Sequence, residues 1–408
     1  MNVNQQERVL LRELAQRYAE LAALPVQTER YNRGRDINDL KPRRPVVWID
    51  EIPWHEMNIE NKLTMVCENH FAREMEWFFR STLYRWEYFQ ADMVVENFYP
   101  ISKRFDNTGI GINISEHTLA ADDKNHIISH DYGIDQLDTI EKVEALKEPI
   151  ITARPEEDAK RVAMAEEVLC GILPVKLRGH YVYYAPWDDI PRYRGVTAAL
   201  TDMIENPELI HATMRKFTQF GLSRARQMEA QNLFDPGIGS LHCTPPYVSD
   251  LPTGTNMKSS WFRAMAQLLT DVSPSMWKEF ELDYVKPLAE MFGLSYYGCC
   301  EVIDAKIPLL KTITNLRKIG VPTRCNPEAC AEQIGGDYVY AHKPNPAFVS
   351  GSFNPDAVSA EIMRVIEACK AHGCAYEFVL KDISTVSYKP ENLIKWNETV
   401  QSTIDRYY

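Results

Sequence analysis

Short β-rich runs alternate with helical runs through the second half of the chain, and no other feature of the sequence constrains the fold as strongly. The β-rich runs lie at 294–300, 317–322, 337–344 and 374–382. The helical runs lie between and around them, at 273–293, 305–313, 326–335, 356–373 and 391–408. Strands joined by helical crossovers lie parallel to one another, so the pattern predicts an α/β fold with a parallel sheet.

Two parallel architectures fit this alternation, a doubly wound sheet and a (β/α)8 TIM barrel. A G-x-G-x-x-G turn after an early strand would favour the doubly wound sheet. The most similar segment, GIGIN at 109–113, lacks the third glycine and is not followed by a clear helix. We therefore predict a barrel over 43–408, a length that one barrel can accommodate. An N-terminal helical extension over 1–42 would precede it, with an amphipathic helix at 5–23 that Pro25 ends.

The composition excludes several classes of partner. Lys and Arg total 45 and Asp and Glu total 57, which gives a formal charge of −12 without a long basic run. We therefore expect neither nucleic acid nor anionic lipid as a partner. The sequence shows no membrane span of ~20 apolar residues and no signal-peptide core near its start. Nine cysteines without regular spacing are typical of free thiols in a reducing compartment, so we expect a cytoplasmic protein. The sequence is also compatible with a homodimer.

Polar and metal-binding residue types recur where the predicted strands end. In a TIM barrel the catalytic residues gather at the carboxyl ends of the strands. Val, Ile, Leu and Tyr fill the strand bodies, whereas the ends carry Asp50 and Glu51, Tyr99, His242 and Cys243, Cys299 to Glu301, His342 and Lys343, and Lys381 and Asp382. We expect side chains from these ends to form one site, with Lys381 and Asp382 among its catalytic groups.

The stretch SYYGCCEVID at 295–304 places two adjacent cysteines and a glutamate at one strand end. Zinc binds Cys sulfur, His nitrogen and carboxylate oxygen, so the predicted ligands are Cys300, Cys299, Glu301 and His242. Cys243 offers the same chemistry. Adjacent residues seldom both reach one ion, which makes Cys300 the principal candidate. The alternative is that these thiols simply pack in the core, where cysteine is common.

The stretch WIDEIPWHE at 48–56 sets acids and a histidine between tryptophans. Such a lining suits an aromatic or apolar substrate with one polar handle. We expect Glu51 and His55 to be catalytic. The predicted substrate-binding side chains are Trp48, Trp54, Tyr99, Tyr297 and Lys343. The alternative interpretation is that both tryptophans are core residues and His55 lies on the surface.

The text from 273 to 321, followed by GGDYVYAHKPNP at 335–346 and YEFVLKDIST at 376–385, resembles the uroporphyrinogen decarboxylase superfamily. The resemblance extends from about Arg44 to the end of the sequence. It implies a (β/α)8 barrel. It also implies one of two activities: decarboxylation without a cofactor, or zinc-dependent methyl transfer with a corrinoid protein or a thiol coenzyme.

Two departures from the superfamily's patterns distinguish these branches. The arginines with which true decarboxylases hold the substrate's carboxylates fall on Glu51 and His55, so an anionic substrate would be repelled. The His-x-Cys pair of the methyltransferases falls on Gly298 and Cys300, so that the cysteine is kept and the histidine is not. Their later cysteine falls near Lys381 and Asp382 and is also absent, so a zinc site would need a different ligand set. The resemblance therefore implies a methyltransferase that moves a methyl group from a small donor, such as a methoxylated aromatic, to a corrinoid protein. A decarboxylase-like enzyme and a non-enzymatic corrinoid- or tetrapyrrole-binding protein are the alternatives.

Overall fold

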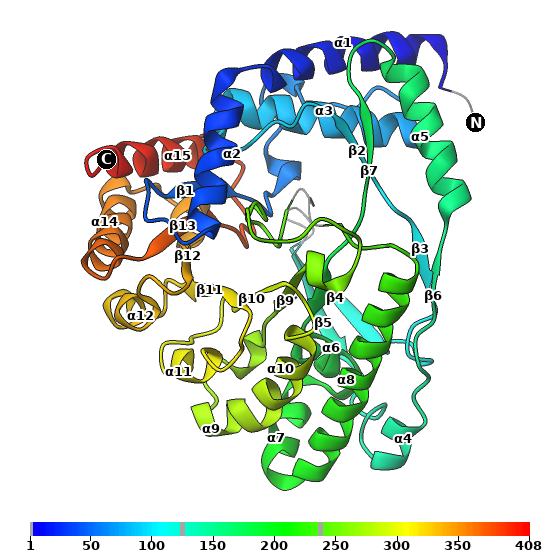
Figure 1. The fold of residues 1–408 in the computed structure, drawn as a ribbon, viewed down its shortest axis with the longest axis vertical. Coiled ribbons are helices and arrows are strands. Elements are labelled where there is room, and N and C mark those ends of the chain that lie inside the picture. The colour runs from blue at the N-terminus through cyan, green and yellow to red at the C-terminus, as the bar shows by residue number, and fades with distance from the viewer. Residues whose placement is uncertain (1–2, 123–126, 236–239) are drawn as a thin grey trace.

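A central parallel sheet organises the chain (Figure 1). The computed structural model describes residues 3–122, 127–235 and 240–408. All strand pairings within the sheet are parallel. In spatial order its seven strands are β1 (Val46–Ile49), β13 (Ala375–Leu380), β12 (Val339–Lys343), β11 (Leu316–Pro322), β10 (Leu294–Tyr297), β9 (Trp261–Ala264) and β8 (Val182–Tyr184). The predicted α/β class and parallel sheet are confirmed.

A ring of eight paired strands is not formed by the described residues. No ladder of hydrogen bonds joins β8 to β1 in these residues. The early β-rich run at 93–100 contributes only to β2 (Tyr99–Ser102), which pairs with β7 (Val175–Arg178) in a separate ribbon. The predicted strand end at 237–243 falls partly outside the described residues, and its last four residues follow an irregular path without a strand.

Helices follow the strands in the second half and cover the sheet from outside (Figure 1). The predicted helix at 273–293 begins where expected, because the Ser273 hydroxyl accepts a hydrogen bond from the Met276 N–H. A π-helical turn at Lys278–Leu282 interrupts it. The helices of this half are α9 (Pro274–Trp277), α10 (Asp283–Ala289), α11 (Ile307–Leu310), α12 (Pro327–Ile334), α13 (Ala347–Ser350), α14 (Pro355–Ala371) and α15 (Glu391–Ile404).

The first half adds helices and small ribbons around the sheet. The ribbons pair β3 (Phe105–Asn107) with β6 (Ile151–Ala153) and β4 (Glu116–Asp122) with β5 (Ile127–Tyr132). The helices are α1 (Gln5–Ala22), α2 (Pro25–Asn38), α3 (His70–Phe89), α4 (Ile140–Glu144), α5 (Pro155–Leu169), α6 (Pro186–Arg194), α7 (Val196–Glu205) and α8 (Pro207–Ala230). None of the described helices has the length and apolarity needed to cross a bilayer.

A second, smaller core lies between the N-terminal helices. Leu11 and Leu14 of α1 pack with Met75 and Phe79 of α3. Tyr99 of β2 closes this layer, with its ring 5.7 Å from that of Phe79. The helical start of the chain is thereby fixed to the body of the protein by apolar burial.

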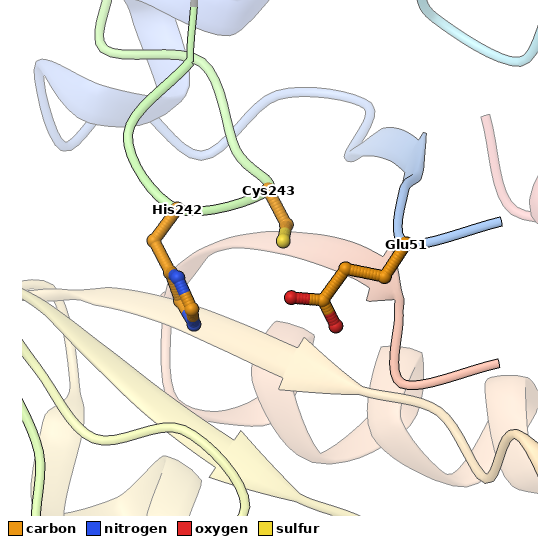
Figure 2. A group of neighbouring side chains, drawn as sticks. All are labelled: Glu51, His242 and Cys243. Atoms are coloured by element: carbon orange, nitrogen blue, oxygen red, sulfur yellow. The ribbon is translucent and has the colours of Figure 1, made fainter. Parts of the chain in front are cut away.

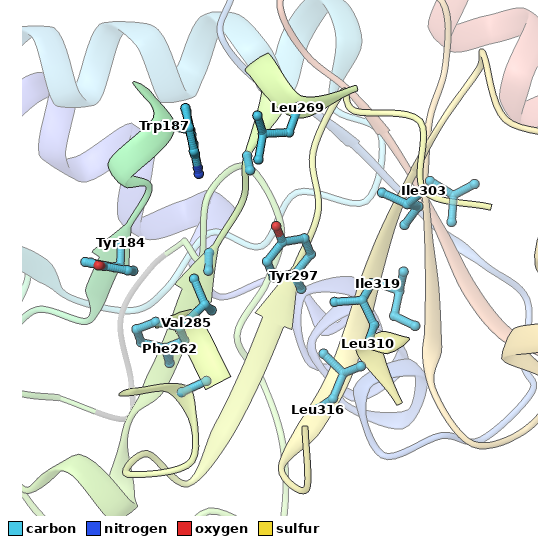
Figure 3. Packing of buried hydrophobic residues seen from close by; sticks show 14 of the residues in the cluster. Tyr184, Trp187, Phe262, Leu269, Val285, Tyr297, Ile303, Leu310, Leu316 and Ile319 are labelled. Atoms are coloured by element: carbon cyan, nitrogen blue, oxygen red, sulfur yellow. The ribbon is translucent and has the colours of Figure 1, made fainter. Parts of the chain in front are cut away.

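The main core lies between the sheet and the helices outside it. Phe262, Tyr297 and Ile319, on three neighbouring strands, are at most 1% exposed. Val285 of α10 and Leu310 of α11 belong to the same cluster (Figure 3). Fully burying a side chain of this kind contributes ~1.5–3 kcal/mol. This layer holds the strands in place beneath the loops that follow them.

The opposite face of the strands carries buried charge. Tyr296 pairs in register with Arg263 on β9 and with Lys318 on β11. The Arg263 guanidinium lies 4.1 Å from the Tyr296 ring centroid, and the Lys318 ammonium donates to Glu377 Oε1 at 2.8 Å. Barrel interiors are usually filled by branched apolar residues. Here a charged layer forms the floor beneath the carboxyl ends of the strands.

Candidate functional site

Four chain segments meet at the carboxyl ends of the strands. Glu51 follows β1, Cys299 and Cys300 follow β10, and Asp382 follows β13. The fourth segment is the loop at 240–244, which carries His242. Residues from both halves of the chain are brought together here, as the strand-end argument predicts.

The two adjacent cysteines lie in direct contact with an imidazole and a carboxylate. Cys299 Sγ is 3.6 Å from Cys300 Sγ and 3.5 Å from His242 Nε2. The Cys300 thiol donates to Asp382 Oδ2 at 2.7 Å. Cys299, Cys300 and Asp382, called the thiol group below, bring one ligand atom each within 4.8 Å of the others.

A second convergent set lies beside the thiol group. Glu51, His242 and Cys243 also bring one ligand atom each within 4.8 Å of the others, and their side chains point toward a shared space (Figure 2). Lys381 links the two sets, because its ammonium lies 3.1 Å from Glu51 Oε2 and 2.7 Å from Asp382 Oδ1. The Asp382 N–H also donates to Glu51 Oε2 at 2.9 Å.

Unusual backbone conformations place these side chains. Glu51, His242, Cys243 and Asp382 have φ values of 48°, 46°, 69° and 55°. The left-handed region costs an L-residue other than glycine ~1–2 kcal/mol. Strain of this kind clusters at functional sites, where the surrounding structure holds it in place. Four residues of this conformation therefore lie within the one cluster.

A close approach of two strands sets the position of Cys299. Gly298 has φ of 92°, and a Cβ atom built on Gly320 of β11 would lie 2.4 Å from the Gly298 carbonyl oxygen. Neither position tolerates a side chain without a shift of the backbone. The Arg263 guanidinium donates to the same carbonyl oxygen at 2.8 Å, which fixes the turn from below.

The pKa values of the two thiols are shifted in opposite directions. The contact with the Cys300 thiol is the main cause that lowers the pKa of Cys299, to about 3, against the opposing effect of burial. The same contact, together with burial, raises the pKa of Cys300 well above its usual value. Burial lowers the pKa of His242. A thiolate beside a neutral imidazole is the protonation state in which these side chains bind metal ions.

The donor set of the cluster fits zinc. Two thiols, an imidazole and a carboxylate are ligand types that zinc selects. Glu301, a predicted ligand, is turned away: its carboxylate accepts from the backbone N–H groups of Ala266 at 3.1 Å and Cys299 at 2.7 Å. Glu301 therefore supports the turn that carries the thiols and does not join their donor set.

A cavity of about 430 Å³ opens beside the cluster. Asp50, next to Glu51, lies in its wall, and so does Ser240, whose hydroxyl accepts from the Cys243 N–H at 3.1 Å. Arg85 contributes a guanidinium to the same wall. The aromatic lining consists of Tyr18, Trp48, Phe78, Phe98, Tyr181 and Tyr247. An aromatic ligand with one polar handle suits this lining.

The predicted substrate-binding residues divide between this cavity and the core. Trp48 lines the cavity, and its indole Nε1 is buried without a hydrogen-bond partner among the described residues. Trp54 packs edge-on against Trp77 at 5.2 Å. Tyr99 lies in the N-terminal core, and the Tyr297 hydroxyl donates to buried Glu281 at 3.0 Å. The apolar patterns that suggested ligand contacts at these three positions reflect packing.

Two other predicted residues also lie apart from the two donor sets. His55 lies on a short 3-10 turn, with Nε2 3.6 Å from Glu56 Oε1 and its ring 6.4 Å from that of Tyr388. The Lys343 ammonium lies 5.4 Å from the centroid of the Tyr296 ring, in the buried layer below the site.

Sequence reasoning gave too little weight to two residues. Cys243 was named for its ligand chemistry but left out of the predicted ligand set, although its thiol belongs to the second convergent set. Arg263 was not considered at all, yet it lies fully buried beneath the turn that precedes Cys299. A single arginine inside an otherwise apolar strand, SWFRAMA at 260–266, was the available signal.

Comparisons with known proteins bear on the fold. No protein-family model and no curated protein matches the sequence. Among solved structures, the chain is similar to a methyltransferase from Methanosarcina mazei, with a TM-score of 0.50 and 12% sequence identity. The similarity covers 93% of this chain and 99% of the other. At this identity, what the two chains are shown to share is an α/β fold.

Proposed function

We propose that the protein is a zinc-dependent methyltransferase of the uroporphyrinogen decarboxylase superfamily, with a barrel of the (β/α)8 type. The proposed reaction moves a methyl group from a small donor to a corrinoid carried by a partner protein. The observation that carries the proposal is the contact of Cys299 and Cys300 with His242 and Asp382 at the carboxyl ends of the strands. The similarity in fold to a methyltransferase is compatible with it.

Cys299, Cys300 and Asp382 would hold the metal, with His242 adjacent. When bound, zinc would supply Lewis-acid polarisation of the donor's ether oxygen or thiol. In the reaction the bond between methyl carbon and oxygen breaks, the acceptor supplies the electron pair for its new bond to carbon, and the released oxyanion takes a proton. The Lys381 ammonium, which contacts Glu51 and Asp382, would supply positive charge to that oxyanion.

A methoxylated aromatic is our first candidate for the donor. The cavity beside the cluster is walled by aromatic rings, the indole of Trp48 among them. The Arg85 guanidinium could pair with a carboxylate on the ring. A methoxybenzoate would therefore place its ring in the cavity and its ether group toward the strand ends.

The test is methyl transfer to reduced cobalamin from a panel of methoxybenzoates, followed by the absorbance of the corrinoid and by the phenol produced. We expect turnover with the zinc-loaded protein and a loss of at least 100-fold in Cys300→Ser, a size typical of removing a group that binds a catalytic metal. Cys170→Ser is the matched control, because Cys170 is an exposed thiol outside the cluster. Full activity in Cys300→Ser or in chelator-treated protein would contradict the proposal.

Incubation with uroporphyrinogen separates methyl transfer from decarboxylation. Glu51 occupies the strand end where the superfamily's decarboxylases are expected to present an arginine, and its carboxylate is partly exposed toward the site. We expect no release of carbon dioxide. Turnover of uroporphyrinogen would favour the decarboxylase alternative.

A further inference from the structure

The second convergent set supplies no metal ligand in the proposed mechanism, where Glu51 holds Lys381 and His242 borders the thiol group. Glu51, His242 and Cys243 come from the segment after β1 and from the loop at 240–244. None of the three belongs to the thiol group. Their side chains point toward a common space from two sides (Figure 2).

We propose that Glu51, His242 and Cys243 bind a second divalent transition-metal ion beside the one held by the thiol group. A thiolate, an imidazole and a carboxylate are a three-protein-ligand set of the kind that leaves one position of a tetrahedral ion open. The ligand atoms already lie within 4.8 Å of one another, so small side-chain movements would bring them around one ion. The inference does not depend on the reaction that the protein catalyses.

The two positions would be adjacent. His242 Nε2 lies 3.5 Å from Cys299 Sγ, which makes the imidazole the boundary between the two donor sets. The Asp382 N–H donates to Glu51 Oε2, and Lys381 contacts carboxylates of both sets. A paired-metal centre is therefore the arrangement to which the geometry points, and in such centres the two ions act on the same substrate.

Metal counting on the full-length protein tests the proposal without any measurement of activity. We expect two zinc ions per chain after loading and removal of excess metal, and one per chain in Cys243→Ser and in Glu51→Gln. Cys300→Ser is expected to lose the other ion and to keep this one. Cys170→Ser, at an exposed thiol elsewhere, should retain two.

Cobalt substitution gives an independent measurement. Cobalt bound at the second position should add a thiolate-to-cobalt absorption band that is absent from Cys243→Ser and kept in Cys300→Ser. One ion per wild-type chain, retained unchanged in Cys243→Ser and Glu51→Gln, would overturn the inference. Circular dichroism of each variant establishes that it is folded, and Glu51→Gln, which keeps the side-chain shape, serves where Cys243→Ser does not fold. Two bound ions without methyl transfer would refute the proposed function and leave this inference standing.

Discussion

Replacing Lys318 by Met should destabilise the protein strongly and loosen the loop that carries His242 and Cys243. Lys318 and Glu377 form an ion pair of 2.8 Å with both side chains fully buried. The Thr244 hydroxyl, next to Cys243, donates to both carboxylate oxygens of Glu377 at 2.7 Å. The pair therefore anchors the loop to the charged floor beneath the site.

The magnitude follows from burial. Burial lowers the pKa of Lys318 to about 8, with Glu377 opposing the shift, so the ammonium is charged at pH 7. Lys318→Met leaves the Glu377 carboxylate without its counter-charge in a dry interior, for which we expect a cost of ~3–5 kcal/mol. Lys318→Met combined with Glu377→Gln removes both charges of the pair and should cost only ~1–2 kcal/mol.

Urea unfolding at pH 7, followed by circular dichroism, measures these free energies. A shift of the transition midpoint with an unchanged dependence of the unfolding free energy on urea concentration gives the change in stability. The double variant should be more stable than Lys318→Met alone. A cost below ~1 kcal/mol for Lys318→Met, or a double variant as unstable as the sum of the two single variants, would refute the reasoning.

Two further predictions concern the support of the site. Burial raises the pKa of Glu281 well above its usual value. The carboxyl therefore keeps its proton in the folded protein, whereas in the unfolded chain it loses the proton above about pH 4.5. The free energy of unfolding consequently decreases as the pH rises from there, by up to ~1.4 kcal/mol per pH unit. The melting temperature of Glu281→Gln, relative to that of the wild type, should increase between pH 5 and 8. A difference in melting temperature that does not change with pH would contradict this. Gly320→Ala should cost ~1–3 kcal/mol and weaken zinc binding, because its Cβ would clash with the Gly298 carbonyl. Gly336→Ala, where a Cβ would meet its nearest atom at 3.7 Å, is the matched control, and equal melting temperatures for the two variants would argue against the clash.

The alternation of β-rich and helical runs was enough to predict the strands of the second half. β10, β12 and β13 lie inside runs read from composition and period alone, and β11 begins one residue before its run. The separate ribbon of β2 and β7 could not be predicted, because strand pairing over long sequence separations leaves no local pattern. The same limit applies to the gap between β8 and β1.

The candidate site was predictable in its chemistry and only partly in its membership. Thiol, imidazole and acid residues after apolar strands lie near one another at the carboxyl edge of the sheet. The face of the sheet to which each side chain points could not be predicted. Where both faces of a strand are buried, its residues do not alternate between apolar and polar types, so the sequence does not distinguish the two faces. Arg317 and Lys318 illustrate this: Arg317 reaches Asp250 on the outside, whereas Lys318 enters the interior. Tyr297 and Glu301 were assigned to the site for the same reason, and their side chains make other contacts.

X-ray absorption at the zinc edge tests the central claim, that the converging strand ends bind a metal through Cys299 and Cys300. The sample is the full-length protein loaded with one equivalent of zinc, compared with Cys300→Ser and Cys170→Ser. We predict sulfur neighbours at about 2.3 Å, with a lower sulfur amplitude in Cys300→Ser and an unchanged amplitude in Cys170→Ser. A zinc ion surrounded by nitrogen and oxygen alone, identical in all three proteins, would contradict the account.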